Sequence, residues 1–237
     1  MNVTKLTPPR LSKDDKYHSI VKAALAAIPG IGGSVAEIFA LVIYPPLVER
    51  QQEWMDAIVK VIGELQQEKR MKIEDLHNDP QFIDALVLAT QIATRTSVKE
   101  KLSALCNAVR NSTSPRRPDH ARQQMFLRLV DEFTEWHLRL LKLVDDPDNW
   151  FGRYKREVPK GSMRAVITHA YTELSDRQDF LSLIWRDLYV RSLVKSERVL
   201  DEIYDFRGML EHDSEEQSDQ LTPMGKQFLR FTEHGNA

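Results

Sequence analysis

The sequence has little cysteine, little net charge and no long uninterrupted apolar run, and each shortage excludes a class of protein. Cys106 is the only cysteine in 237 residues, which rules out an internal disulfide or a cysteine-rich zinc site and fits a reducing cytosol. The formal net charge of -2, from 33 basic and 35 acidic residues, gives no overall field that would attract nucleic acid or an anionic membrane. Any such binding must be local.

Motifs that carry enzymatic chemistry are also missing. Gly30, Gly32 and Gly33 look like part of a dinucleotide-binding loop, but Val35 stands where the third glycine of that loop belongs. The seven histidines are scattered, and none has another histidine at the spacing of a helical metal site. We therefore predict that the protein is not an enzyme and has no catalytic residues, metal site or cofactor.

The stretch from Ile20 to Leu47 contains only two charged residues, so it must leave water. Pro29-Gly30-Ile31-Gly32-Gly33 interrupts it, because proline lacks an amide donor and glycine costs a helix about 1 kcal/mol relative to alanine. This pattern predicts a hairpin with arms at Ile20 to Ile28 and at Val35 to Tyr44. Pro45-Pro46 is then expected to turn the chain before a polar helix begins.

Two interpretations of this hairpin remain open. In the first it is the buried centre of a helical bundle, and in the second it is an element that enters a membrane when released. Neither arm has the roughly 20 apolar residues that a membrane-spanning helix needs. Under either interpretation the apolar side chains that carry the role include Ile28, Ile31, Ile38, Phe39 and Val42.

Composition divides the chain into parts. Residues 1–11 have no apolar period and predict a flexible arm, and residues 12–112 predict a helical bundle around the hairpin. Residues 113–118 contain two prolines next to small polar residues, which is typical of a linker. A second domain is expected at residues 119–233.

Apolar spacing predicts three helices in the first domain after the hairpin. A helix from about Leu47 to Lys69 has a 3.5-residue seam, and a helix from about Pro80 to Thr94 is apolar nearly all round and is expected to be interior. Ser97 and Glu100 have the spacing of a capping box for the third helix. Cys106 lies beside its apolar stripe and is expected to be a small buried hydrophobe. The seam of the first helix is made by Leu47, Trp54, Ile58, Val61 and Leu65.

In the second domain a single long helix is predicted from about Asp119 to Val144. His137 lies on its apolar stripe, where a histidine is usually a core residue whose ring nitrogens find polar partners. The segment from Asp145 to Gly161 is expected to be irregular. His137 and His169 are the two histidines that could meet in this domain.

The last part of the chain is expected to hold two more helices and the only strands. A short helix is predicted from Ser162 to Tyr171, and Ser175 with Gln178 predicts a capping box for a helix that runs to about Val190. The β-branched and aromatic residues that follow suggest strands, namely Val199, Ile203, Tyr204 and Phe206.

The run Leu183-Ile184-Trp185-Arg186-Asp187-Leu188-Tyr189-Val190-Arg191-Ser192-Leu193-Val194-Lys195, followed by Leu221-Thr222-Pro223-Met224-Gly225, resembles the end of a winged helix-turn-helix domain of the MarR kind. This resemblance implies a recognition helix, a β-hairpin wing and a closing helix that begins at the Leu-Thr-Pro-x-Gly phrase. Ser192 stands where those proteins usually have glycine. The N-terminal half looks like that of uncharacterised bacterial helical proteins with a Pro-Gly-Ile-Gly-Gly hairpin.

Local charge favours protein contact over DNA. Residues 150–200 have ten basic and six acidic residues, but residues 201–220, where the wing is expected, have eight acids and one arginine. An acidic wing would repel phosphates. The basic residues that could contact DNA or a partner are Arg153, Lys155, Arg156, Arg186 and Arg191.

The sequence as a whole therefore predicts a mainly α protein, with a helical bundle followed by a winged-helix-like domain with a small β wing. Its expected function is that of a bacterial cytoplasmic interaction or regulatory protein, working through a protein partner or self-association. Two alternatives stay open: a membrane-active effector that uses residues 20–47 at the membrane periphery, and a DNA-binding transcriptional regulator.

Overall fold

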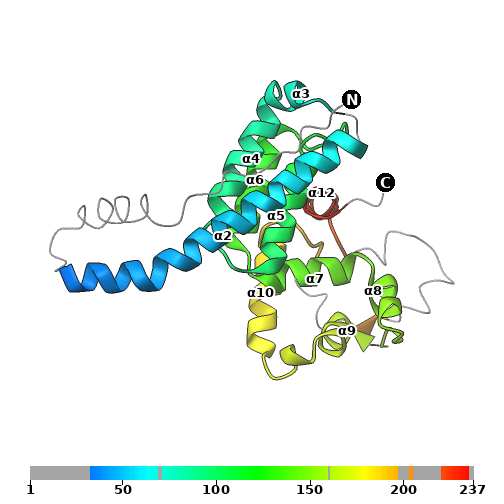
Figure 1. Cartoon of the computed structure of the whole chain (residues 1–237). Coiled ribbons are helices and arrows are strands. Elements are labelled where there is room, and N and C mark those ends of the chain that lie inside the picture. The colour runs from blue at the N-terminus through cyan, green and yellow to red at the C-terminus, as the bar shows by residue number, and fades with distance from the viewer. Residues whose placement is uncertain (1–32, 69–70, 160, 197–202, 205–219, 235–237) are drawn as a thin grey trace. The chain divides into compact units, whose positions relative to one another are not determined.

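The computed structural model describes residues 33–68, 71–159, 161–196, 203–204 and 220–234, with side chains described from Pro46 onward (Figure 1). This part of the chain is mainly helical, as predicted. The chain divides into two compact units, Met1–Pro115 and Arg116–Ala237, and the division falls inside the proline-containing segment 113–118. Within the described residues no helix has both the length and the apolar run needed to cross a bilayer.

The first described element is one helix, α2 (Gly33–Glu68), and it corrects the turn predicted at Pro45-Pro46. A proline inside a helix removes one backbone hydrogen bond and clashes with the preceding turn, which can bend the helix without ending it. The ribbon of α2 changes direction within its blue portion (Figure 1), which is the expected consequence. The predicted first arm and glycine turn of the hairpin lie outside the described residues.

The first unit is completed by α3 (Ile73–His77), α4 (Pro80–Ala93) and α5 (Lys99–Asn111). Helices α2, α4 and α5 pack against one another around a core of small and large apolar side chains. The indole Nε1 of Trp54 donates to Thr90 Oγ1 at 3.0 Å, which satisfies the polar atom of a buried ring. From α2 this core takes the predicted seam residues Trp54, Ile58, Val61 and Leu65.

Three details of the predicted bundle are wrong. Leu47, the first residue of the seam, is 42% exposed, whereas the seam is buried from Trp54 onward, about two helical turns later. Helix α4 is not interior all round, since Val87 is 51% exposed. The capping box from Ser97 does not form: α5 starts one residue later than that box requires, and the Val98 amide is taken by Thr96 Oγ1 at 3.2 Å.

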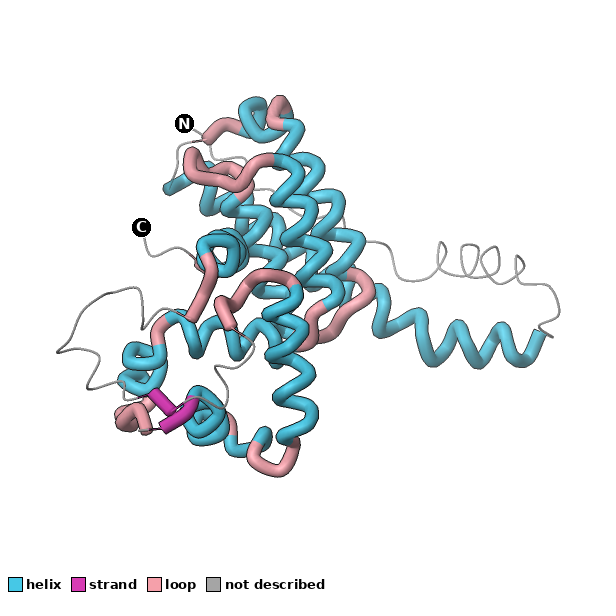
Figure 2. The backbone as a smooth tube through the Cα atoms, turned by 180° about the vertical axis from the view of Figure 1, so that it is seen from behind, coloured by secondary structure: helices cyan, strands magenta, loops and turns pink. Residues whose placement is uncertain are grey.

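The second unit contains six α-helices, one 3-10 turn and two short strands among its described residues. Strands β1 and β2 pair in antiparallel fashion, with Gly161 opposite Tyr204 and Ser162 opposite Ile203 (Figure 2). The elements, in chain order, are α6 (His120–Glu132), α7 (Glu135–Asp145), α8 (Pro147–Arg153), β1 (Gly161–Ser162), α9 (Met163–Ala170), the 3-10 turn η1 (Thr172–Leu174), α10 (Gln178–Val190), β2 (Ile203–Tyr204) and α12 (Pro223–Thr232).

The long helix predicted from Asp119 to Val144 is wrong, because α6 and α7 are separate helices. Phe133 has extended backbone angles (φ -68, ψ 147) at the end of α6. Thr134 starts α7 with its own amide bonded to the ring of His137. The helical apolar spacing continues in phase across this break, which is why the sequence pattern did not reveal it.

Helix α8 corrects the irregular segment predicted from Asp145 to Gly161. The Asp146 carboxylate accepts a hydrogen bond from the Asn149 amide at 2.9 Å, and Pro147 occupies the first helical position, where its missing amide costs nothing. The helix predicted from Ser162 is confirmed, with Ser162 Oγ accepting from the Ala165 amide. The capping box expected at Ser175 is wrong, since α10 starts at Gln178.

Aromatic rings fill the centre of the second unit. Phe126 lies edge-on to Phe228 at 5.4 Å between centroids, and Phe133 lies edge-on to the same ring at 5.9 Å. These contacts hold α12 on α6 and α7, and α10 packs on α7 through the fully buried Trp185 and Leu188. Burying each such side chain contributes about 1.5 to 3 kcal/mol.

Helix α10 ends in a Schellman motif that requires a left-handed residue. Ser192 has φ 58, its amide donates to Tyr189 O at 2.8 Å, and the Leu193 amide donates to Leu188 O at 3.0 Å. The chain then meets the start of α12, where the Thr222 amide donates to Leu193 O and Thr222 Oγ1 donates to Ser192 O. Serine therefore occupies a backbone position that favours glycine.

We expect Ser192→Gly to stabilise the protein by about 1 kcal/mol, because the left-handed conformation is strained for a residue with a Cβ atom. Urea denaturation followed by far-UV circular dichroism measures the change. The matched control is Ser175→Gly, at an exposed serine with right-handed angles (φ -59, ψ -43), which should lose about 0.5 to 1 kcal/mol. Equal effects at the two serines would contradict the prediction.

Candidate functional site

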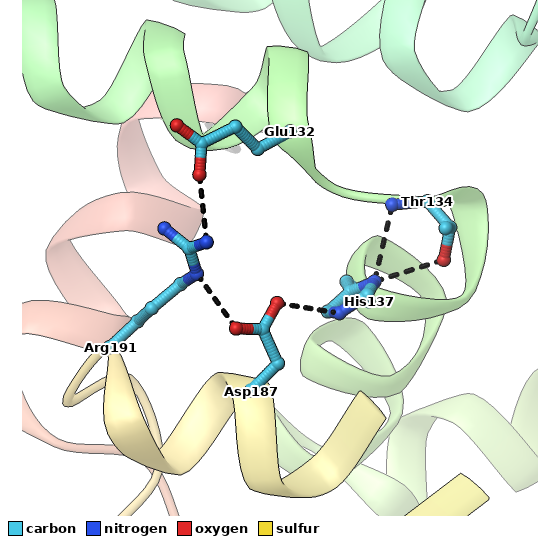
Figure 3. A network of polar contacts seen from close by, with 5 residues as sticks. All are labelled: Glu132, Thr134, His137, Asp187 and Arg191. Atoms are coloured by element: carbon cyan, nitrogen blue, oxygen red, sulfur yellow. Dashed lines mark hydrogen bonds and ion pairs between the residues drawn. The ribbon is translucent and has the colours of Figure 1, made fainter. Parts of the chain in front are cut away.

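A network of polar side chains joins α10 to α6 and α7 (Figure 3). Arg191 follows the last turn of α10, and its Nη2 lies 2.7 Å from Glu132 Oε2 while its Nε donates to Asp187 Oδ1 at 3.0 Å. The other carboxylate oxygen of Asp187 lies 3.2 Å from His137 Nε2. Asp187 thus bridges an arginine and a histidine, and fixes the inner face of α10.

His137 is buried, 7% exposed, and each ring nitrogen has a polar neighbour: Thr134 at Nδ1, and at Nε2 the Asp187 carboxylate, 3.2 Å away in a geometry that makes no regular hydrogen bond. The Thr134 amide donates to Nδ1 at 3.2 Å, and Thr134 Oγ1 lies 2.9 Å from the same nitrogen. Because an amide can only donate, Nδ1 must accept, and the ring hydrogen sits on Nε2, facing Asp187. This arrangement caps α7 and orients the ring.

The ring of Phe133 contacts both His137 and Arg191. It is stacked on the imidazole at 4.6 Å with an interplanar angle of 3°, and the guanidinium of Arg191 lies 5.6 Å from the Phe133 centroid. Burial alone would lower the pKa of Arg191, but the hydrogen bond and charge of Asp187, together with Glu132, raise it above its ordinary value. The positive charge of Arg191 is therefore paired with Asp187 and Glu132 inside the second unit.

Three predicted contact residues lie on or just after α8. Arg153 is exposed, and its Nε donates to Asn149 Oδ1 at 3.4 Å. Lys155 is exposed with φ 53, and Arg156 donates to the carbonyl oxygen of His169 while its guanidinium lies 5.6 Å from the Phe151 ring. Figure 1 shows α7 between α8 and α10, the helix that carries Arg186.

The outer face of α10 carries exposed apolar side chains. Leu183 is 64% exposed, Tyr189 40% and Val190 69%, whereas Ile184, Trp185 and Leu188 on the inner face are buried. Two charged residues, Asp179 and Arg186, are exposed on the same side of the helix. We call the surface made by Asp179, Leu183, Arg186, Tyr189 and Val190 the α10 outer face.

The other candidate residues either pack against or pair with neighbouring side chains, or their side chains are not described. His137 pairs with Asp187, and His169 stacks on Phe151 at 5.7 Å between centroids. Burial raises the pKa of the half-buried Cys106 thiol, which opposes a nucleophilic role. Ile28 and Ile31 lie outside the described residues, and Ile38, Phe39 and Val42 belong to α2 but their side chains are not described.

Burial also raises the pKa of Tyr171, to about 12, and its hydroxyl donates to Arg139 O at 3.4 Å. Its ring is part of an edge-to-face series with Trp136 and Trp150. This aromatic series serves as packing that joins α7, α8 and the end of α9.

Among the residues that the structure describes, no cluster of histidine, cysteine, aspartate and glutamate could hold a metal ion.

Sequence reasoning missed Thr134 and Asp187 as partners of His137, and Glu132 as the partner of Arg191. A signal for part of this was present, because Thr134 and His137 have the spacing of a helix cap and its third residue, and Asp187 and Arg191 have the i, i+4 spacing of a helical ion pair. Nothing in the sequence indicated that the pair Thr134 and His137 lies in contact with the pair Asp187 and Arg191.

Comparison with known proteins adds no relative to these observations: no family model, curated protein or solved structure matches this chain. The network and the α10 outer face are therefore interpreted from their own geometry.

Proposed function

We propose that this chain is a non-enzymatic bacterial cytoplasmic interaction or regulatory protein, whose second unit is a winged-helix-like module that contacts another polypeptide through the α10 outer face. The observation that carries the proposal is the exposure of Leu183, Tyr189 and Val190 on one side of a single helix. Aromatic and apolar side chains at the centre of a patch, with charges at its edge, are typical of protein interfaces.

The order of elements supports the winged-helix part of the proposal. Strand β1 leads into α9, a short turn leads to α10, and the chain after α10 pairs with the start of the closing segment through Val194 and Leu221 in an antiparallel bridge. Thr222 then caps α12 by accepting from the Gly225 amide at 2.9 Å. This order of elements supports our proposal that α10 corresponds to a recognition helix.

Electrostatics favour a polypeptide over DNA as the partner of α10. A helix that meets phosphates or base edges needs free basic and polar side chains, but the outer face has one arginine, one aspartate and three apolar residues. Arg191 is engaged by Glu132 and Asp187. The sequence from 201 to 220 adds eight acids and one arginine.

Site-specific photocrosslinking in the native host tests the proposal. A benzophenone amino acid replaces Leu183 in one variant and Arg128, an exposed residue of α6, in the control. We expect a discrete polypeptide adduct from position 183 that is lost when Val190→Asp is added, and none from position 128. Absence of an adduct at 183, or tight salt-sensitive binding of random duplex measured by fluorescence anisotropy and lost in Arg186→Glu, would overturn the proposal in favour of another role.

A further inference from the structure

The C-terminal end of α8 carries the most exposed aromatic side chain of the described residues. Tyr154 is 61% exposed, and its ring lies 4.7 Å from that of the partly buried Trp150 between centroids, with an interplanar angle of 43°. Trp150 is held in turn by Phe151 and Tyr171, with centroid distances of 4.9 and 5.3 Å. One aromatic ring is therefore presented to solvent on a support of packed rings.

Three cationic side chains adjoin this ring in the chain. Arg153, Lys155 and Arg156 are exposed, and since three extended residues span at most about 11 Å, they and Tyr154 occupy one small region. Glu157 is the one acid that follows directly. Among the described residues the Lys155 ammonium group has no ion pair or hydrogen bond. We call the surface made by Trp150, Arg153, Tyr154, Lys155 and Arg156 the α8 surface.

Lys155 occupies a backbone position that favours glycine. It has φ 53, its amide donates to Gly152 O at 3.0 Å, and the Arg156 amide donates to Phe151 O at 3.1 Å, which are the two bonds of a Schellman motif. A residue with a Cβ atom is strained in this conformation, and residues held under such strain are concentrated at functional sites. Lysine lowers the stability of this turn relative to glycine but places a charge beside Tyr154.

We infer that the α8 surface binds single-stranded nucleic acid, with a base stacked on Tyr154 and the neighbouring phosphates on Arg153 and Lys155. Proteins that bind single strands combine aromatic rings, on which bases stack, with basic side chains that follow the backbone. An acidic polypeptide would meet the cations but would leave the exposed ring without a planar partner. An anionic membrane fits less well, because the α8 surface has no aliphatic side chain to insert among lipids.

A duplex fits this surface less well than a single strand. The bases of a duplex stack on one another, so no base face is free to cover Tyr154. Asp146 and Asp148 are exposed at the start of α8 and confine the attraction for phosphates to the other end of this short helix. The inference goes beyond the proposed function, since it assigns a second partner to a different helix.

Fluorescence anisotropy of the full chain with labelled oligouridylate and oligodeoxythymidylate of about 12 nucleotides tests the inference. Two or three phosphate contacts predict a slope of about -1.4 to -2 for the logarithm of affinity against that of salt concentration, and a dissociation constant on the order of 10 μM at about 50 mM salt. A duplex of the same length should bind at least about tenfold more weakly than the single strands.

Substitutions at Tyr154 separate stacking from apolar contact. Tyr154→Leu should weaken binding by about tenfold, whereas Tyr154→Phe, which keeps the ring, should stay within about twofold of the wild type.

Lys155→Gly separates binding from stability. It should weaken binding by about threefold to tenfold and reduce the salt slope by about 0.7, because one phosphate contact is lost. The same change should raise the urea midpoint of unfolding, because it relieves the left-handed strain. The matched control is Arg128→Gln, which removes an exposed cation from α6 and should leave binding within about twofold of the wild type.

Three results would each overturn the inference: no anisotropy change with either oligonucleotide at about 200 μM protein, a duplex that binds as tightly as the single strands, or binding unaffected by both Tyr154→Leu and Lys155→Gly. Flotation with phosphatidylserine vesicles that is lost in Tyr154→Leu, without oligonucleotide binding, would also reject it and assign the α8 surface to a membrane. Photocrosslinking from position 183 reports on the α10 outer face separately, so either proposal can fail without the other.

Discussion

Gly225→Ala is expected to lower the free energy of unfolding of the second unit by about 4 kcal/mol. A Cβ atom on Gly225 would lie 2.1 Å from the carbonyl oxygen of Leu193 and 3.0 Å from its carbon, and both are backbone atoms that cannot rotate away. The start of α12 would have to move off the chain that follows α10. Overpacking of this kind typically costs 1 to 3 kcal/mol.

The displacement also removes hydrogen bonds. The Thr222 amide donates to Leu193 O at 3.0 Å, and Thr222 Oγ1 donates to Ser192 O at 2.6 Å. Each lost bond costs about 1 kcal/mol, which brings the total to the expected value. The whole stability of a domain is about 5 to 15 kcal/mol, so we expect a shift of the urea midpoint that is visible without extrapolation.

Gly152→Ala is the matched control for this variant. Gly152 lies in α8, and a Cβ atom there would have nothing within 4 Å. Alanine is the better helix former by about 1 kcal/mol, so this change should be neutral or stabilising. A Gly225→Ala protein that unfolds within 1 kcal/mol of the wild type would show that α12 does not depend on this close approach.

Asp187→Ala is expected to cost about 2 to 3 kcal/mol, because it removes the partner of two side chains at once. His137 would lose the carboxylate that lies 3.2 Å from its buried Nε2, and Arg191 would keep only Glu132 as an ion-pair partner. A buried donor that loses its acceptor costs about 1 to 3 kcal/mol. The carboxylate is partly exposed, which screens its pairing with Arg191 and keeps the total below that of a fully buried ion pair.

A double-mutant cycle separates this network from simple loss of charge. Asp187→Ala and His137→Ala together should cost at least 1 kcal/mol less than the sum of the two single changes, since each removes the same contact. Asp187→Asn, which keeps an acceptor oxygen, should fall between the wild type and the alanine variant. The control is Asp176→Ala, at an exposed aspartate of the turn before α10, expected within 0.5 kcal/mol of the wild type. Additive effects would show that the two residues act separately.

The proposals depend on different parts of this scaffold. The inner network holds α10 against α6 and α7, while the outer face is available to a partner. Substitutions of Asp187 or Gly225 are therefore expected to reduce stability, whereas Leu183→Asp is expected to change association and leave the fold intact. This division lets a loss of binding be distinguished from a loss of structure.

Features that depend on near neighbours in the chain could be predicted from the sequence. The stripe of Trp54, Ile58, Val61 and Leu65 is buried as its spacing indicated. The Leu-Thr-Pro-x-Gly phrase, whose resemblance implies a closing helix, is where α12 starts, with Thr222 as its cap and Pro223 in its first turn. Ser192 stands where that resemblance has glycine, and its φ of 58 favours glycine. In each case the interacting groups lie within a few residues of one another.

Only the tertiary structure decided the break at Phe133 and the course of α2 through Pro45-Pro46. Apolar residues fall in phase on both sides of the break, so the periodicity of one long helix and of two packed helices is the same. At the two prolines the local cost of about 3 kcal/mol each was known, but whether a helix bends or ends depends on what its continuation packs against. After the bend, α2 buries its seam against α4 and α5.

The candidate site was likewise predicted in part from the sequence, and the rest was decided by the tertiary structure. The sequence predicted a helix up to about Val190 that contains Arg186 and is followed by Arg191, but not which of the two arginines faces solvent. Arg191 pairs with Glu132, a carboxylate distant in the sequence. Trp185 and Leu188 are buried, while Leu183 and Val190 on the other side of the helix are exposed. A helix that is apolar on two sides can bury only one of them inside its own unit, and contacts between distant residues determine which side is left for a partner.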